Sequence, residues 1–371
     1  MTPRQVEREL QRQKVLFEER ITSGQFLPAN VKFQEFADRW MTEYSAKQHK
    51  AKTQEANRAA LERINAGIGH IRLDRLQPHH ILAFLNQLEE PGQNKRTGAG
   101  LSSKTIQNIY RVISSILSTA TTWGIIAHNP AQRVKPPKVQ RKEAKSLDDE
   151  QTMRLLVALR SAPIKYRTAI EVLIFTGARR GEMLGLIWDD VDFDNCTLNI
   201  SKASLYLPDR GIYEDTPKND GSRRVIKLPR TVIDTLRTYR AYQAEEQLKC
   251  GDQWRGMGHI FTQWDGSPMH PDTLTGWFCK FVQRENAVID KRNDLAEDEK
   301  ATLRFPAISP HSLRHTNASL LIASGANIRT VAARLGHAQT STTTNIYSHA
   351  IKTADAIASD ALEAVLMAKQ G

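Results

Sequence analysis

The sequence is poor in cysteine and lacks long apolar runs, and each shortage excludes a class of protein. Its 371 residues contain only Cys196, Cys250 and Cys279, which are far apart and have no CxxC spacing. A disulfide framework and a cysteine zinc site are therefore excluded, and a reducing compartment is expected. No apolar run approaches the roughly 18 residues of a membrane span, and no apolar signal segment opens the chain. We expect a soluble intracellular protein without a membrane partner.

Acidic residues are also in short supply relative to basic ones. The chain has 52 Lys+Arg against 41 Asp+Glu, a formal net charge of +11. Such an excess favours a polyanionic partner, with nucleic acid ahead of a membrane surface. A soluble basic protein without such a partner is the alternative. The 40% of hydrophobic residues can form cores, and the length suggests two domains.

Apolar residues at 3.6-residue spacing predict four helices in residues 31–127 and therefore a compact helical domain. Residues 128–146 break the pattern with prolines and hold a run of cations against one acid, Glu143. A basic linker of this kind is suited to a phosphate backbone, although a solvated linker without a partner is the alternative. The candidates for backbone contact are Arg133, Lys135, Lys138, Arg141, Lys142 and Lys145.

The second domain is predicted in residues 147–351 and mixes helices with a few strands. Alternation around an Asp/Asn turn in residues 188–200 predicts a hairpin, and residues 222–228 predict another strand. Residues 291–300 are expected to form an exposed, solvated insertion. The fold class is therefore mainly α with a small antiparallel β-sheet, an all-α domain followed by a mixed α+β domain. The predicted helices cover residues 148–160, 165–175, 180–187, 231–247, 271–287, 310–323, 327–335 and 352–368.

Two Arg-containing motifs place pairs of functional side chains three residues apart. In residues 176–182 (TGARRGE), Arg179 and Glu182 are expected on one helix, with the carboxylate holding the guanidinium. In residues 311–315 (HSLRH), His311 and Arg314 share a helix face, so both point to the same place. A surface ion pair and an exposed basic helix turn are the respective alternatives.

Three further candidates follow in polar or glycine-containing segments: Lys218 at the tip of a predicted hairpin, His337 in LGH, and Tyr347 in NIY. A tyrosine pKa near 10 leaves only about one part in a thousand ionised at neutral pH, so a nucleophilic phenol needs a proton acceptor and positive charge. Arginines can neutralise phosphate oxygens and histidines can move protons. Together the groups can attack a phosphodiester without a metal. Taken singly, the tyrosine fits a packing role and the lysine a solvated turn.

In these motifs the chain resembles the tyrosine recombinases, or phage integrase family. The likeness extends from about Val31 to the C-terminus and includes residues 100–106 (GLSSKTI) and 127–131 (AHNPA). It implies that Arg179 and Arg314 clamp the scissile phosphate while His311 assists proton transfer.

The same resemblance gives roles to the other candidates. Lys218 would protonate the departing 5′ hydroxyl, and His337 would hydrogen-bond a phosphate oxygen. Tyr347 would form a 3′-phosphotyrosyl bond, and Glu182 and His315 would brace the site. Asn219 departs from the threonine that relatives often have there.

The resemblance further implies a site-specific recombinase that integrates or excises a mobile element of a phage or conjugative transposon. It would need no cofactor or metal and would act as a homotetramer on double-stranded DNA, with accessory DNA-bending or excision factors. Its location would be the bacterial cytoplasm, at the nucleoid.

The implied domains are a core-binding (SAM-like) domain in 31–127, a basic linker in 128–146, a catalytic domain in 147–351 and a C-terminal helix for protomer exchange in 352–371. Residues 1–30 would be a helical linker or the remnant of an arm-binding module, from a chain that is truncated or never had that module.

Three other functions remain open at this stage. Residues 325–340 have the spacing of a helix-turn-helix, which a transcriptional regulator would use without the arginine, lysine and tyrosine candidates. A type IB topoisomerase uses similar tyrosine chemistry without exchanging strands between partners. A metal-dependent nuclease is disfavoured because the sequence has no clustered carboxylates that suit Mg²⁺.

Overall fold

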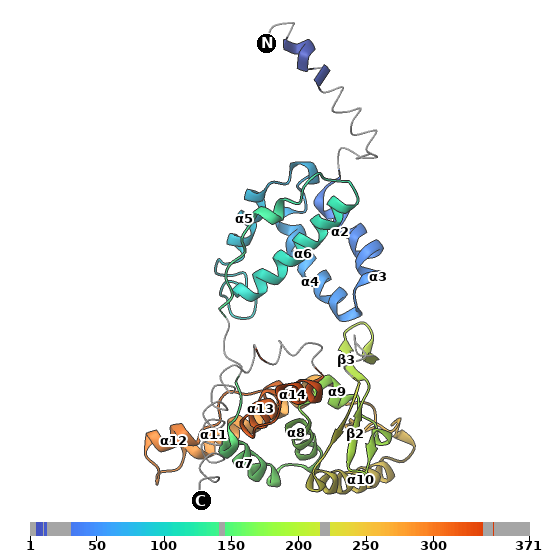
Figure 1. Cartoon of the computed structure of the whole chain (residues 1–371), viewed down its shortest axis with the longest axis vertical. Coiled ribbons are helices and arrows are strands. Elements are labelled where there is room, and N and C mark those ends of the chain that lie inside the picture. Colours follow the sequence, from blue (N-terminus) through green and yellow to red (C-terminus); the bar gives the residue numbers. More distant parts are fainter. Residues whose placement is uncertain are drawn as a thin grey trace, which may run out of the picture. The chain divides into compact units, whose positions relative to one another are not determined.

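The chain divides into two compact units, Met1–Arg141 and Lys142–Gly371. Helices dominate both units, and the described strands belong to the second, where they form small antiparallel sheets (Figure 1). The predicted fold class, mainly α with a small antiparallel sheet, is confirmed. The computed structural model describes residues 5–9, 11–12, 31–140, 145–215, 223–336 and 344.

The first unit confirms the four predicted helices. Its elements are α2 (Phe33–Arg39), the π-helix η1 (Trp40–Ser45), α3 (Ala46–Gln48), α4 (Ala51–Ile68), the short 3₁₀ turn η2 (Leu73–Arg75), α5 (Pro78–Gln87), α6 (Ser103–Thr122) and the 3₁₀ turn η3 (Pro130–Arg133).

Helix α6 is the centre of the first core. Its N-terminus is capped by Ser102, whose hydroxyl accepts from the backbone N–H of Thr105 at 3.3 Å. The apolar stripe of α6, which includes Ile106, Ile113 and Leu117, is buried. The adjoining η1 is tied to α6 by the indole N–H of Trp40, which donates to Thr119 Oγ1 at 3.0 Å.

The beginning of the predicted linker packs on this first core. Asn129 is buried and its amide donates to the Ser114 carbonyl oxygen at 3.0 Å. Ala131 and Val134 belong to the same apolar cluster, and Tyr110 donates its hydroxyl to the Ala131 carbonyl at 2.9 Å. Residues 129–134 therefore have the contacts of a domain, and the exposed basic stretch begins after Val134.

The second unit has more elements. They are α7 (Asp149–Ala158), η4 (Leu159–Ser161), α8 (Ile164–Thr176), α9 (Arg180–Leu184), η5 (Trp188–Asp190), β1 (Val191–Asp192), β2 (Thr197–Ile200), β3 (Ala203–Leu207), β4 (Gly211–Asp215), β5 (Arg224–Lys227), α10 (Arg230–Cys250), η7 (Gly251–Gln253), α11 (Pro271–Asp290), α12 (Glu297–Leu303), α13 (Pro310–Ala323) and α14 (Ile328–Leu335).

Helix α8 occupies the middle of the second core. It lies between α13 and α10 and packs on both (Figure 1). Its residues 168–174 are all buried, as expected for a helix covered on every side. Since α8 ends at Thr176, the core fixes the point from which the chain proceeds to Arg179.

The strands form two separate sheets. β1, β2 and β5 pair antiparallel, with Leu198 opposite Ile226, while β3 pairs with β4. The predicted hairpin at residues 188–200 and the strand at 222–228 are confirmed. The hairpin tip expected at Lys218 lies outside the described residues, and the strands on either side of it, β4 and β5, pair with β3 and β2 respectively.

Two local predictions need correction in the second unit. The sequence pattern does not predict β3 and β4. Residues 291–300, expected to be a solvated insertion, include the start of α12, and Lys300 within it is buried while its amino group pairs with Glu297 at 2.9 Å. The predicted exposure is confirmed for residues 291–294 and 296–299.

Candidate active site

A turn at Gly177 connects the end of α8 to Arg179. Gly177 ends α8 with φ of +62°, in the left-handed region that favours glycine. A Cβ at Gly177 would lie 2.6 Å from Leu335 Cδ2, so no larger residue fits without displacement. Thr176 stabilises this turn, because its hydroxyl donates to the Val172 carbonyl at 2.6 Å and accepts from the Ala178 N–H at 3.1 Å.

Arg179 is held at two points by one carboxylate. Its backbone N–H donates to Glu182 Oε2 at 2.9 Å and its Nη1 donates to Glu182 Oε1 at 2.6 Å. The two residues were expected on one helix, but Arg179 has extended backbone angles and is the N-cap of α9. The side chain is 43% exposed, so the fixed guanidinium remains accessible from solvent.

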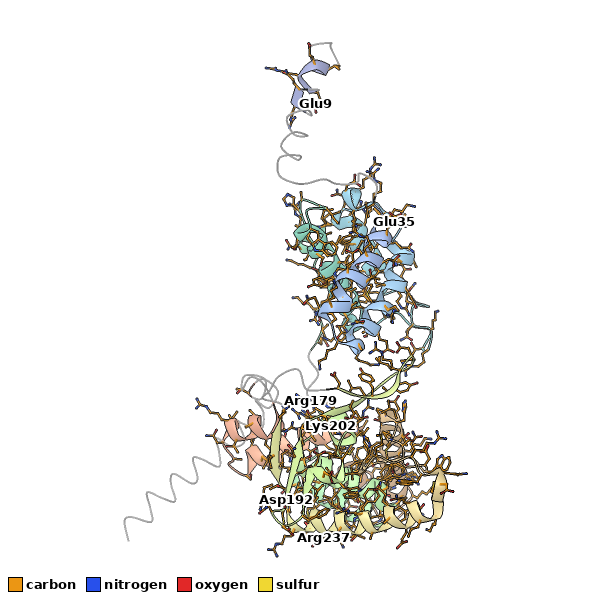
Figure 2. The ribbon with its side chains drawn as sticks, turned by 90° about the vertical axis from the view of Figure 1, so that its right-hand side faces the viewer. Glu9, Glu35, Arg179, Asp192, Lys202 and Arg237 are labelled. Atoms are coloured by element: carbon orange, nitrogen blue, oxygen red, sulfur yellow. The ribbon has the colours of Figure 1, made fainter. Side chains whose placement is uncertain are left out.

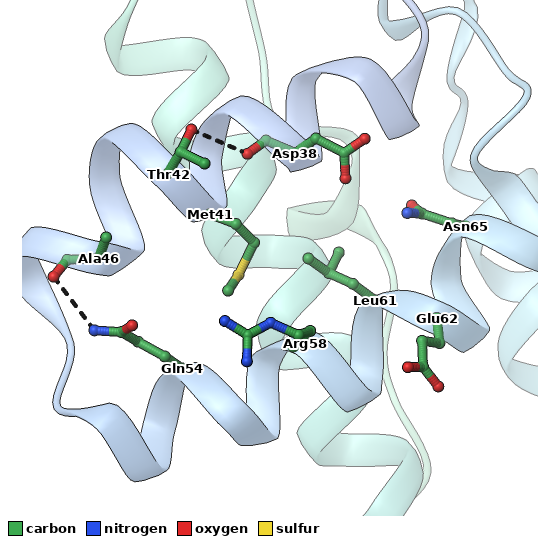
Figure 3. A pocket seen from close by; sticks show the side chains of 9 residues that line it. All are labelled: Asp38, Met41, Thr42, Ala46, Gln54, Arg58, Leu61, Glu62 and Asn65. Carbon is green, nitrogen blue, oxygen red and sulfur yellow. Dashed lines mark hydrogen bonds between the residues drawn. The ribbon is translucent and has the colours of Figure 1, made fainter. Parts of the chain in front are cut away.

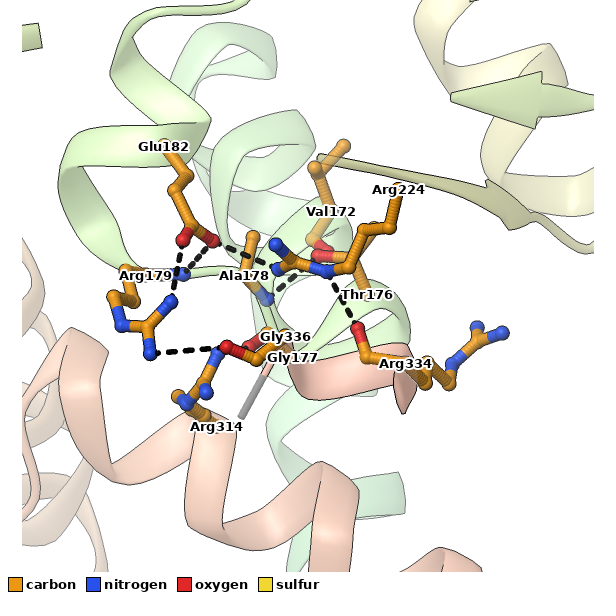
Figure 4. A network of polar contacts seen from close by, with 10 residues as sticks. All are labelled: Val172, Thr176, Gly177, Ala178, Arg179, Glu182, Arg224, Arg314, Arg334 and Gly336. Atoms are coloured by element: carbon orange, nitrogen blue, oxygen red, sulfur yellow. Dashed lines mark hydrogen bonds and ion pairs between the residues drawn. The ribbon is translucent and has the colours of Figure 1, made fainter. Parts of the chain in front are cut away.

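Glu182 has a second basic partner, Arg224 of β5, which sequence reasoning did not identify as a site residue. Arg224 Nη2 donates to Glu182 Oε2 at 2.8 Å, and only 6% of the Glu182 side chain is exposed. Burial alone would raise the pKa of the Glu182 carboxyl, but the hydrogen bond and charge of Arg224, aided by Arg179, hold it below its ordinary value. Glu182 is therefore a carboxylate at neutral pH, and Figure 4 shows its contacts with Arg179 and Arg224.

The sequence contained a signal for Arg224. Side chains two residues apart in a strand lie on the same face. Arg224 is two residues before the buried Ile226, so the predicted strand already placed this arginine toward the core. A guanidinium directed inward needs an acidic partner, and that partner is Glu182.

Arg314 of α13 contacts the same turn. Its residue is 3% exposed, and its Nη1 donates to the carbonyl oxygen of Gly177 at 2.8 Å. Arg179 Nη2 contacts the Gly336 carbonyl at 3.4 Å, at the end of α14 (Figure 4). Backbone carbonyls thus contact both arginines, which come from separate elements.

His311 lies near both arginines, and His315 lies one turn further along α13, near His311 and Arg314. The His311 ring is edge-on to His315, with centroids 5.2 Å apart. Burial and the charges of Arg314, Arg179 and Arg180 lower the pKa of His311. Burial, His311 and Arg314 lower the pKa of His315 to about 4. A neutral His311 imidazole has a lone pair with which to accept a proton.

The structure brings together five of the eight predicted catalytic and supporting residues. Arg179, Glu182, His311, Arg314 and His315 lie in this region. The other three, Lys218, His337 and Tyr347, lie outside the described residues.

The remaining sequence predictions concern the basic linker, metal binding and membrane spans. Four of the six linker cations are exposed: Arg133, Lys135, Lys138 and Lys145. The other two, Arg141 and Lys142, lie outside the described ranges. Among the described residues, His, Cys, Asp and Glu side chains form no group of three or more suited to a metal ion. In the same ranges, no helix combines the length and apolar composition needed to cross a membrane.

A pocket of about 490 Å³ lies in the first unit, between α4 and the segment from α2 to α3 (Figure 3). Met41 and Leu61 give it apolar surface, and Asp38, Arg58 and Glu62 give it charges of both signs. None of the predicted site residues within the described ranges lines it. Its mixed charge does not match the phosphate chemistry predicted for the site.

Comparison with known proteins gives one consistent result. Residues 145–353 match the model described as the phage integrase family, and residues 33–136 match the phage integrase central domain. The tyrosine recombinase XerC-like protein of Caldanaerobacter subterraneus is 29% identical over 276 residues, which cover 70% of this chain and 65% of that protein. The ICEBs1 integrase of Bacillus subtilis is 27% identical over 253 residues, covering 67% and 62%. The chain thus spans less than two thirds of the length of these relatives.

Solved structures of similar fold include DNA complexes. The Tn1549 transposon integrase with transposon right end DNA has a TM-score of 0.70 at 21% identity, covering 88% of this chain and 98% of that one. A lambda integrase tetramer bound to a Holliday junction has a TM-score of 0.58 at 18% identity, covering 90% and 87%. At these identities the likeness establishes the fold.

Proposed function

Since this chain belongs to the phage integrase family, we propose that it is a site-specific DNA recombinase that works through a 3′-phosphotyrosyl intermediate. Its task would be to integrate or excise a mobile element. The observation that carries the proposal is the convergence of Arg179, the N-cap of α9, and Arg314 of α13 on one place beside His311. Two fixed guanidiniums next to a neutral imidazole are suited to a phosphodiester.

The proposed reaction exchanges one phosphodiester for another. The Tyr347 oxygen bonds to phosphorus as the bond to the 5′ oxygen breaks, His311 assists transfer of the phenol proton, and Lys218 protonates the departing oxygen. The 5′ hydroxyl of a second duplex then attacks the phosphotyrosine and releases Tyr347. Bond energy is retained, so no nucleotide cofactor is needed, and the arginines and His311 would do without a metal the charge neutralisation and proton transfer that the reaction requires.

The arginines would act mainly in the transition state, where negative charge builds on the phosphate oxygens. Arg179 and Arg314 are fixed before the substrate arrives, so little rearrangement is needed as that charge develops. Each such contact contributes about 2.7–4 kcal/mol. His337 would add a hydrogen bond to a phosphate oxygen, while Glu182 and His315 would brace the charged groups.

The domain roles form part of the same proposal. Residues 31–127 would form the core-binding domain and 147–351 the catalytic domain. Residues 352–371 would form the helix exchanged between protomers. The cations of 128–146 would contact the DNA backbone, with residues 129–134 anchored to the first unit. Residues 1–30 would link to, or remain from, an arm-binding module.

The proposed partners are double-stranded DNA recombination sites, three further copies of the chain, and accessory DNA-bending or excision factors. Support for DNA comes from the Tn1549 integrase complex, and support for a tetramer from the lambda integrase bound to a Holliday junction. Such a protein would act in the bacterial cytoplasm, at the nucleoid.

The test is a nicked DNA substrate that carries the element end and loses its short 5′ fragment after cleavage. The proposal predicts an SDS-resistant protein–DNA adduct in EDTA, absent with Tyr347→Phe. Transfer of the cleaved strand to a second duplex separates a recombinase from a topoisomerase. DNA binding without an adduct from the wild-type chain would indicate a regulator and refute the proposal.

A further inference from the structure

We propose that Arg224 is a positioning residue of this site, which holds Glu182, and through it Arg179, against the last turn of α14. The inference rests on the proposed function and adds to it a residue that would not touch the DNA. It connects the sheet to the arginine clamp.

The contacts of Arg224 run in two directions. Its Nη2 donates to Glu182 Oε2 at 2.8 Å, and its Nε donates to the carbonyl oxygen of Arg334 at 2.6 Å (Figure 4). Only 7% of the Arg224 side chain is exposed. Since Glu182 binds both the backbone and the guanidinium of Arg179, a displacement at Arg224 would pass through one carboxylate to Arg179.

The end of α14 is shaped around this guanidinium. Gly336 has φ of +66°, and a Cβ there would stand 2.8 Å from Arg224 Nη1. Arg334 is itself fixed, because its Nη2 donates to the carbonyl oxygens of Phe175 at 2.7 Å and Lys227 at 3.2 Å. Arg224 therefore links α9, β5 and the last turn of α14, and His337 follows Gly336 directly in the chain.

The charge balance at Glu182 makes this role measurable. Among the residues that the structure describes, the charged groups that face the carboxylate are Arg179, at the start of α9, and Arg224 of β5, with Arg334 of α14 close to Arg224. Removing Arg224 deletes a hydrogen bond and a positive charge, while the burial that opposes ionisation remains. The carboxyl should then protonate at higher pH and release its hold on Arg179.

The first experiment measures single-turnover cleavage of the nicked substrate by Arg224→Gln. We expect cleavage about 100-fold slower, the scale of a small misplacement of a catalytic group, with DNA affinity equal to that of the control. The acid limb of the rate profile should move to higher pH. The control is Arg237→Gln, which removes the same charge from an exposed side chain on α10 at the opposite end of the unit from Arg179 (Figure 2).

The second experiment tests whether Arg224 acts through Glu182. The double variant Glu182→Gln/Arg224→Gln should cleave no more slowly than Glu182→Gln alone. Its pH–rate profile should lack the acid limb that Arg224→Gln shows at higher pH, because the Glu182 carboxyl is gone. Arg224→Lys keeps the charge but offers one nitrogen to two acceptors, so it should recover only part of the rate. Should Arg224→Gln fail to fold, Arg224→Lys and the double variant carry the test.

Different outcomes separate the two levels of the argument. If the wild-type chain forms no adduct, the proposed function fails. If the wild-type chain cleaves and Arg224→Gln cleaves equally fast, only the role of Arg224 is overturned. The same follows if the rate losses of Glu182→Gln and Arg224→Gln multiply in the double variant. A loss of rate explained wholly by weaker DNA binding, or full recovery by Arg224→Lys, would overturn it as well.

Discussion

Replacing Arg314 by lysine tests the most buried group of the site. The arginine is 3% exposed, and its Nη1 donates to the Gly177 carbonyl at 2.8 Å. Lysine keeps the charge but has one nitrogen, so it cannot hold that carbonyl and also present a fixed fork to a phosphate. Loss of one prearranged transition-state donor costs about 2.7–4 kcal/mol, or about 10²–10³ in rate. We expect Arg314→Lys to slow single-turnover cleavage by at least about 100-fold.

The assay follows adduct formation on nicked DNA over time, with affinity measured separately by mobility shift. Arg329→Lys is the matched control, because Arg329 is exposed on α14 and the substitution also preserves charge. Both variants should bind DNA like the wild-type chain. A wild-type cleavage rate for Arg314→Lys would refute the assignment of Arg314 to the phosphate clamp.

Three further predictions concern stability. Gly177→Ala should lower the free energy of unfolding in urea by about 2–5 kcal/mol. A Cβ would lie 2.6 Å from Leu335 Cδ2, and a φ of +62° adds a conformational cost for alanine. A decrease in this free energy below about 0.5 kcal/mol would contradict this packing. Trp40→Phe should cost about 1–3 kcal/mol by removing the 3.0 Å bond to Thr119, and an unchanged urea midpoint would count against that bond. His315 has a folded pKa of about 4 against an ordinary 6.5, so between these values the unfolded state binds the proton and stability falls as pH is lowered. His315→Asn should flatten that fall in a pH series of melting curves, and an unaltered slope would exclude His315 as its source.

Local sequence patterns predicted the features that depend on neighbouring residues. The stripe of α6 repeats every three or four positions, so its helix and its buried face follow from spacing alone. The spacing of three residues also predicted that Glu182 holds Arg179, although Arg179 is the N-cap of α9, and that His311 and Arg314 lie on one helix. In each case the partner is within one helical turn.

Contacts between distant segments were not predictable in this way. Arg224 meets Glu182 across 42 positions, and the strands around Lys218 pair with β3 and β2 instead of each other. A strand pattern gives the inward face of a residue but not its pairing partner. The π-helix η1 was missed because its buried residues, Trp40 and Ser45, are five positions apart and the second is polar, so the apolar pattern does not show the wider turn.

The proposed reaction requires that Tyr347 becomes joined to DNA at a phosphorus clamped by Arg179 and Arg314. The most direct measurement is mass spectrometry of the adduct trapped on nicked DNA, after digestion of both protein and DNA. We expect a single peptide that carries a 3′-linked nucleotide on Tyr347. A nucleotide linked to any other side chain, or through its 5′ phosphate, would refute the proposed role of Tyr347.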